Sequence, residues 1–254
     1  MSYEALSMES FMESDYSLSI RNVGKMFHLY SSSKDRLKQQ IFRHKKFYDE
    51  FWALQNISFN MERGESRGIL GHNGAGKSTL FRILAGTMKP TAGDILLRGR
   101  VGAIMTMGSG FRQDFTGREN VYVLSALMNI SRDQVDDQMD TIREFADIGI
   151  FFDSPIRTYS TGMVARLAFA VYTTLSPDIL IVDEAINVGD ADFQKKCHGH
   201  VSDLLNKGMT FLLVSHSPAI VRQFCKKATV LEKGKVIYDG DVEPALELYN
   251  RTRP

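Results

Sequence analysis

The chain has 254 residues, of which 43% are hydrophobic, and its formal net charge at pH 7 is +1. This is enough apolar material for one large core with a helical lobe attached. The near-zero charge argues against nucleic acid as a partner, and only two cysteines favour a reducing compartment over a disulfide framework. Residues 1–17 are polar and acidic, unlike a secretory signal, and no apolar run approaches the roughly eighteen residues that span a bilayer. Any membrane role is therefore expected to come through a partner.

The N-terminal part of the chain predicts a polar tail followed by an antiparallel sheet. Residues 1–16 form the tail, and residues 17–23 alternate apolar and polar side chains as a half-buried strand does. Residues 51–61 resume this alternation, and a turn at residues 62–65 leads into a short apolar strand at residues 66–70. These partly solvated strands are expected to precede a parallel core.

Residues 31–48 interrupt that sheet with a serine cluster and an excess of lysine and arginine. Leu37, Ile41 and Tyr48 would lie near one face of a short basic amphipathic helix. Two interpretations stay open at this point. The segment is either a solvated surface insertion or a helix that contacts a membrane surface or a membrane partner.

Residues 71–79, GHNGAGKST, fit the phosphate-binding pattern G-x-x-x-x-G-K-[ST]. Its glycines let the backbone turn tightly, so that successive N–H groups converge on one polyanion. Lys77 adds a positive charge, and the Ser78 hydroxyl suits a magnesium ion. A strand precedes the loop and a helix at residues 79–85 follows it, the order that aims amides and helix dipole at phosphate. The predicted nucleoside triphosphate site comprises Gly71, His72, Asn73, Gly74, Ala75, Gly76, Lys77, Ser78 and Thr79.

The rest of the chain alternates predicted strands and helices around one helical block. Strands are expected at residues 94–98, 101–107, 179–182 and 210–214 and in a hairpin at 228–239. Helices are expected at residues 118–129, 133–148, 162–175, 192–206, after Pro218, and at 242–249. No strand interrupts residues 112–165, which predicts a helical lobe. The fold class is therefore α/β over residues 17–254, with a mainly parallel sheet, an antiparallel β subdomain and a helical lobe.

An acidic pair, Asp183-Glu184, closes the apolar strand at residues 179–182. Apolar strands of such folds that end on an acid place it at the carboxyl edge of the sheet, where ligands bind. Asp183 is suited to hold magnesium alongside Ser78, and Glu184 to orient or deprotonate the water that attacks the γ-phosphate. Together with the phosphate loop, the pair predicts hydrolysis of the bound nucleotide.

Tyr159-Ser160-Thr161-Gly162-Met163 precedes an unbroken helical stretch. Ser160 is suited to cap that helix, and the free amides behind it would form a second anion site. On composition alone, an ordinary capped helix explains the segment better.

Taken together, these segments resemble the nucleotide-binding subunit of ABC transporters from about residue 17 onward, a P-loop NTPase fold. The stretch at residues 160–163 resembles the family signature, usually LSGGQ, with Thr161 and Met163 replacing its first glycine and glutamine and Tyr159 replacing the leucine. Arg166 falls where the family carries an arginine. The resemblance implies ATP contacts from Ser160, Gly162, Asp190, His216 and an adenine-stacking aromatic, Phe27, for which Tyr30 is a near alternative.

The family usually carries a glutamine at the beginning of the helical lobe that reaches magnesium and the attacking water. In this sequence the best register places Arg112 there, and Gln113 follows one position later. We take Gln113 as the candidate magnesium ligand, and the choice between the two residues stays open.

Within the family, the chain resembles the ATPases of capsular polysaccharide and lipopolysaccharide O-antigen exporters. The resemblance is carried by residues 108–120 (GSGFRQDFTGREN), by the variant signature and by residues 183–197. Wall-teichoic-acid exporters share much of these motifs. The resemblance implies two copies paired head to tail around ATP and Mg²⁺, docked on two copies of a polytopic permease. It implies export of a polysaccharide from the cytoplasmic face of the inner membrane. Some O-antigen exporter ATPases add a carbohydrate-binding domain after the hairpin, and we expect none here. The alternatives are a soluble ABC ATPase acting on ribosomes or DNA, and a phosphate-loop kinase or GTPase.

Overall fold

The computed structural model describes residues 14–42, 44–104, 110–175, 177–183 and 189–252. Within these ranges the larger sheet contains β3 (Ser66–Leu70), β5 (Val101–Ile104), β6 (Ile179–Asp183), β7 (Thr210–Val214), β8 (Lys227–Glu232) and β9 (Lys235–Asp241). Their order is β5-β6-β7-β3-β8-β9. All neighbours are parallel except β8 and β9, which form an antiparallel hairpin. The predicted mainly parallel sheet is confirmed.

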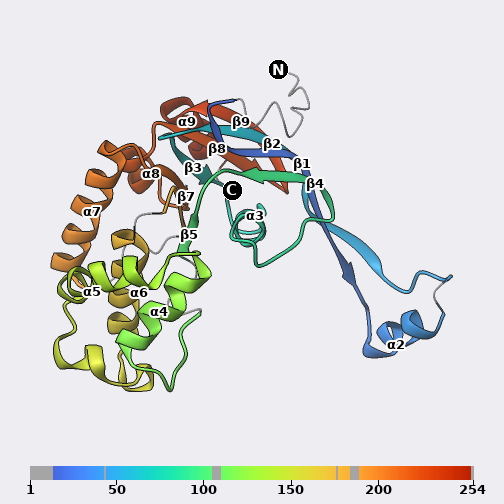
Figure 1. Ribbon diagram of the computed structural model, residues 1–254. Coiled ribbons are helices and arrows are strands. Elements are labelled where there is room, and N and C mark those ends of the chain that lie inside the picture. Colours follow the sequence, from blue (N-terminus) through green and yellow to red (C-terminus); the bar gives the residue numbers. More distant parts are fainter. Residues whose placement is uncertain (1–13, 43, 105–109, 176, 184–188, 253–254) are drawn as a thin grey trace.

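A separate antiparallel sheet contains β1 (Tyr16–Leu29), β2 (Asp49–Glu62) and β4 (Ala92–Leu97), in the order β2-β1-β4. The antiparallel subdomain predicted before the parallel core is thus present, and β4 joins it from after the phosphate loop. The first strand is longer than residues 17–23, because the ladder with β2 continues to the pair Leu29 and Asp49. This long hairpin extends away from the body of the protein (Figure 1).

The hairpin carries a short helix, α2 (Ser33–Ile41), at its far end (Figure 1). Leu37 and Ile41 are 60% and 66% exposed, and α2 has no buried residue. The expectation that Tyr48 shares their helical face is wrong, because the helix ends before it. The Tyr48 ring instead stacks on His28 of β1, with 3.7 Å between the ring centroids.

The remaining helices fall into two groups. Those that pack on the larger sheet are α3 (Lys77–Leu84), α6 (Thr161–Thr174), α7 (Ala191–Asn206), α8 (Pro218–Phe224) and α9 (Val242–Arg251). The helical lobe contains α4 (Gly117–Leu127), α5 (Arg132–Ala146) and two short 3₁₀ turns, Gly149–Asp153 and Ile156–Thr158. It packs against α6 to one side of the sheet (Figure 1). Within the described ranges, no helix combines the length and apolar character needed to cross a bilayer.

Both faces of the larger sheet are covered, which explains why its central strands β6 and β7 are almost wholly apolar. Leu180 and Val182 of β6 point into a core shared with α6, α7, α8 and α9. Ile179 and Ile181 of the same strand point into a second core with α3 and the antiparallel sheet. Alternate side chains of β6 therefore pack into different cores, and this requirement fixes the register of the strand.

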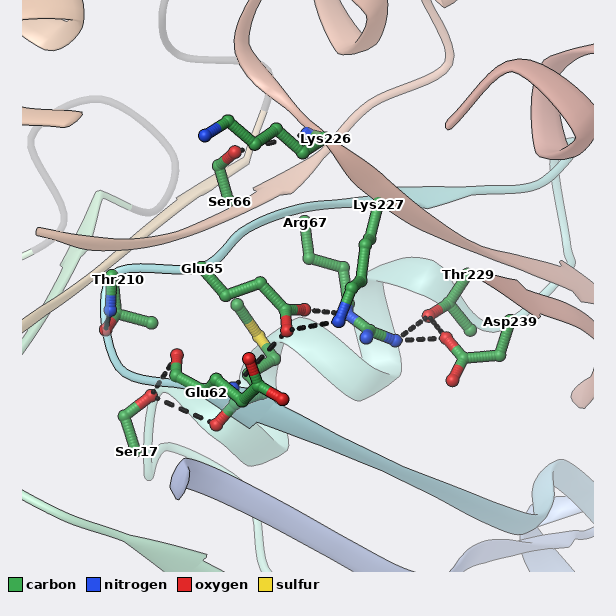
Figure 2. A network of polar contacts seen from close by, with 12 residues as sticks. Ser17, Glu62, Glu65, Ser66, Arg67, Thr210, Lys226, Lys227, Thr229 and Asp239 are labelled. Carbon is green, nitrogen blue, oxygen red and sulfur yellow. Dashed lines mark hydrogen bonds and ion pairs between the residues drawn. The ribbon is translucent and has the colours of Figure 1, made fainter. Parts of the chain in front are cut away.

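A buried ionic network ties the N-terminal end of β3 to the β8–β9 hairpin (Figure 2). The Arg67 side chain is 3% exposed, and its Nε donates to Glu65 Oε1 at 2.7 Å. Its Nη1 donates to Thr229 Oγ1 at 3.1 Å and pairs with Asp239. Lys227 gives Glu65 a second cation at 3.1 Å. Every charged member of the network thus has an opposite charge within reach.

Replacing Arg67 by alanine is expected to lower the free energy of unfolding by about 3–5 kcal/mol, because it removes a buried guanidinium and takes the cation from Asp239, whose side chain is 19% exposed. Urea denaturation of the full chain measures this change. Arg157→Ala serves as the control, since its ion pair with Asp114 is mostly exposed and is worth about 0–1 kcal/mol. Equal stability of the two variants would contradict a stabilising role for the network.

Candidate nucleotide-binding site

The loop between β3 and α3 has a backbone shape that requires glycine. Gly74 and Gly76 have φ values of +80° and +103°. A Cβ on Gly76 would lie 2.7 Å from the carbonyl oxygen of Ala53, and one on Gly71 would lie 2.7 Å from that of Leu231. The loop therefore packs closely against β2 and β8. It leads directly into the N-terminus of α3, where backbone amides lack helical partners and the helix dipole favours anions.

Lys77 is the first residue of α3, and its side chain folds back over this loop. Its Nζ donates to the carbonyl oxygens of Gly71 at 2.6 Å and His72 at 3.3 Å. A depression of about 260 Å³ follows the loop and is lined by residues 73–79 together with Phe51 and Ala53 of β2. The predicted phosphate-loop residues are thus brought together, while their contacts with nucleotide stay a prediction.

Three neighbouring strands deliver the other predicted groups to the same edge of the sheet. β6, β7 and β3 are adjacent and parallel, with Asp183 opposite Val214 and Val214 opposite Ile69. Asp183 therefore lies at the carboxyl end of β6, two strands from the phosphate loop. His216 is exposed in the loop that follows β7. Glu184 lies outside the described residues.

The candidate adenine-stacking residues lie on the β1–β2 hairpin. Phe27 is paired with Phe51 across the ladder, and Phe51 is the aromatic residue that lines the depression. Cross-strand partners share a face of the sheet, so Phe27 lies on the same side as Phe51. Tyr30 packs instead with Tyr48, at 5.8 Å between ring centroids. Phe27 remains the candidate from the sequence, and Phe51 joins it as a residue that the sequence reasoning missed.

The signature-like segment begins α6, as predicted. Ser160 is the N-cap, and its Oγ accepts the N–H of Met163 at 3.2 Å. The preceding Tyr159 donates its hydroxyl to the carbonyl oxygen of Phe151 at 2.6 Å, which ties the segment to the helical lobe. Burial raises the pKa of Tyr159 to about 12, so its hydroxyl keeps its proton at physiological pH. Ser160 is exposed and Gly162 partly exposed, so the amides behind the cap face an open surface.

Asp190 caps α7 and also contacts the signature helix. Its Oδ1 accepts the N–H of Phe193 at 3.0 Å, and Arg166 of α6 donates to its Oδ2 at 2.5 Å. The Phe193 amide first, and then Arg166, lower the pKa of Asp190 below its ordinary value. Arg166 also pairs with Asp147 at the end of α5, at 3.5 Å. One arginine thus connects α6, the helical lobe and the loop that contains Asp190.

The beginning of the helical lobe is held by a residue that the sequence reasoning missed. Asn120 of α4 is fully buried, and its amide donates to the carbonyl oxygens of Arg112, Phe115 and Thr116 at 2.9–3.1 Å. Its Oδ1 accepts the N–H of Arg112 at 2.7 Å. Arg112 and Gln113 are both exposed on this fixed loop. The signal that could have revealed Asn120 is an amide on the apolar face of a predicted helix.

The model of the ABC transporter family matches residues 54–187, more than half of the chain. The chain belongs to this family. The ATP-binding cassette of this family binds and hydrolyses ATP, which agrees with the phosphate loop and with the acidic residue at the end of β6. ABC transporter protein AbcA of Aeromonas salmonicida is 41% identical over 234 residues, which cover 92% of this chain and 76% of AbcA.

Two further relatives cover most of this chain. An O-antigen export system ATP-binding protein, RfbB of Klebsiella pneumoniae, is 38% identical over 239 residues, which cover 92% of this chain and 97% of RfbB. The teichoic acids export ATP-binding protein TagH of Bacillus anthracis is 38% identical over 236 residues, which cover 93% of this chain but 43% of TagH.

Solved structures of ABC cassettes share the fold. The ATP-binding cassette MJ0796, in a dimeric post-hydrolysis state bound to ADP and Pi, superposes with a TM-score of 0.71 at 20% identity, covering 89% of this chain and 99% of that one. The cassette cbiO1 of Clostridium perfringens gives a TM-score of 0.64 at 24% identity, covering 92% of both chains. The predicted ABC ATPase fold is therefore confirmed.

Proposed function

We propose that this chain is the ATP-hydrolysing subunit of an exporter for a lipid-linked cell-surface polysaccharide, either O-antigen or capsule. The observation that carries the proposal is the similarity to RfbB along nearly the whole of both chains. TagH, at comparable identity, is named for teichoic acids export, which makes teichoic acid the second candidate cargo. A soluble ABC ATPase acting away from a membrane is the less favoured alternative.

In this proposal the protein contributes mainly positioning and charge, because phosphoryl transfer needs little covalent chemistry from it. Lys77 and the loop amides hold the phosphates, and the Ser160 and Gly162 amides of a second copy close over the γ-phosphate. Glu184 accepts the proton of the attacking water. His216 contacts the γ-phosphate, and Asp190, at the N-terminus of α7, adds a further contact with ATP.

The oxygen donors at the sheet edge fit a magnesium ion. Ser78 offers a hydroxyl and Asp183 a carboxylate, and Mg²⁺ in nucleotide sites commonly keeps one or two protein ligands plus water and phosphate oxygens. The ion would neutralise charge on the β- and γ-phosphates. Of the two candidates in the lobe, Gln113 has an amide oxygen, which can act as a metal ligand or accept a hydrogen bond from water, whereas the Arg112 guanidinium has no acceptor atom. We therefore keep Gln113 as the third proposed residue at the ion, which it would contact directly or through a bound water.

The proposed assembly pairs two copies head to tail and docks them on two copies of a polytopic permease. Two solved structures of the cassette MJ0796 are dimeric, which supports the pairing. The export-system names of the relatives support a membrane partner. The chain would then act at the cytoplasmic face of the inner membrane.

Deleting the gene for this chain in its host tests the proposal. We expect loss of the surface polysaccharide and accumulation of its lipid-linked form inside the cell, with rescue by the wild-type chain. Sugar and phosphate analysis of the accumulated material separates O-antigen or capsule from teichoic acid. Unchanged surface glycan, together with co-purification of the tagged chain with ribosomes instead of a polytopic membrane protein, would overturn it.

A further inference from the structure

Helix α9 packs one apolar face against the larger sheet. It ends beside the phosphate loop and the loop that follows β7. Ala245, Leu246 and Tyr249 on this face are 0%, 0% and 3% exposed. The N–H of Val242, at the beginning of the helix, donates to the carbonyl oxygen of Lys226 at 3.0 Å. The helix lies beside α8 and the β8–β9 hairpin (Figure 1). Its last turn is therefore held in place by the core.

The ring of Tyr249 contacts the phosphate loop. It stacks on His72 with 4.6 Å between ring centroids and 16° between the ring planes. The hydroxyl of Thr252, just beyond α9, lies 3.5 Å from Nε2 of the same histidine. His72 follows Gly71 directly, so the first part of the phosphate loop is contacted from the end of α9.

The hydroxyl of Tyr249 contacts a different loop. It donates to the carbonyl oxygen of His216 at 3.3 Å. The neighbouring Ser215 donates its N–H to the carbonyl oxygen of Ile69 at 3.2 Å, and its Oγ accepts the N–H of Ser217 at 3.0 Å. The backbone around His216 is thus fixed both by the end of β3 and by α9.

A tyrosine used only to fill the core would not need its hydroxyl. Burying a phenol hydroxyl is unfavourable unless the group finds a hydrogen-bond partner, and phenylalanine would supply nearly the same volume. Here the buried ring lies on one loop, and its hydroxyl bonds the backbone of the other. These two contacts act on the two loops that are expected to hold the same γ-phosphate.

We propose that Tyr249 is a positioning residue for ATP hydrolysis. Its ring places the phosphate loop through His72, and its hydroxyl places the backbone that presents His216. The inference rests on the γ-phosphate contact of His216 proposed above, and adds α9 as the element that keeps both loops in register. Binding should depend mainly on the ring, and turnover on the hydroxyl.

The test compares Tyr249→Phe, Tyr249→Leu and His216→Ala with the wild-type full chain. One neutral hydrogen bond corresponds to about a 2- to 10-fold change, so Tyr249→Phe should lower kcat by that factor while the Kd for ATP, measured without magnesium, stays constant. Tyr249→Leu also loses the ring stack and should weaken ATP binding. A double-mutant cycle with His72→Ala should show that this weakening depends on His72.

Tyr238→Phe is the matched control, because Tyr238 packs against the same core from β9 and should leave kcat and Kd unchanged. Wild-type kcat in Tyr249→Phe would overturn this inference, as would a loss of kcat accompanied by an equal loss of ATP affinity and thermal stability. Wild-type hydrolysis by His216→Ala would overturn the proposed role of His216 and, with it, the role of the Tyr249 hydroxyl. Slow hydrolysis by His216→Ala together with wild-type kcat in Tyr249→Phe would overturn this inference and leave the role of His216 standing. The two proposals can therefore fail separately.

Discussion

Glu184→Gln is expected to lower ATP turnover by about 10²- to 10⁴-fold while ATP still binds, which is the range for loss of a general base. Glutamine has nearly the same shape as glutamate and still forms hydrogen bonds, but it cannot take a proton from water. The sequence places Glu184 directly after Asp183, the residue that ends β6 at the edge shared with the phosphate loop. Phosphate release by the purified complex and equilibrium ATP binding, measured in parallel, check the prediction.

Glu247→Gln is the control for this experiment. Glu247 is on α9, 70% exposed, and paired only with Arg251 at 3.8 Å among the described residues. We expect it to leave turnover unchanged. Hydrolysis by Glu184→Gln at close to the wild-type rate would remove Glu184 from the role of base.

Mixed complexes that carry Lys77→Ala in one chain and Ser160→Arg in the other should recover about half of the wild-type ATPase activity, whereas complexes uniform in either change should be nearly inactive. In a head-to-tail pair each site takes Lys77 from one chain and Ser160 from the other. The mixed complex therefore keeps one intact site. Lys77 begins α3 and Ser160 caps α6, and these two helices pack in different cores of one chain.

The matched control places both changes in one chain and pairs it with a wild-type chain. It contains the same substitutions in the same numbers, but each head-to-tail site now has one defect, so we expect almost no activity. Two differently tagged chains and sequential affinity purification give both complexes. If the control hydrolysed ATP and the first complex did not, each chain would complete its own site, and the head-to-tail proposal would be wrong.

The phosphate loop could be predicted because its information is local. The spacing of Gly71, Gly76 and Lys77 specifies a tight turn before a helix, whatever the rest of the chain does. The buried strands were predicted for a similar reason, since a sheet covered on both faces needs runs such as those of β6 and β7. The capping role of Ser160 was also evident, because a cap concerns only the next three residues.

Predictions that depended on distant partners were less complete. The extension of β1 to Leu29 follows from its pairing with β2, and Tyr48 contacts His28 instead of continuing α2. The position of Asn120 on the apolar face of a helix could be read from the sequence, but the carbonyl groups that it binds appear only once the loop has been placed around it. Each of these features depends on a partner that is distant along the chain, and a local sequence pattern does not show which partner that is.

By itself, the sequence determined that this chain has a phosphate loop, an acidic strand end and a capped second helix, each a short-range pattern with its own chemistry. Only the tertiary structure decided which of these share an edge, because the order β6-β7-β3 brings together strands that are far apart along the chain. It also placed Tyr249 between His72 and His216. Long-range packing, not local propensity, selects such neighbours, since it is the burial of both sheet faces that fixes where each helix lies.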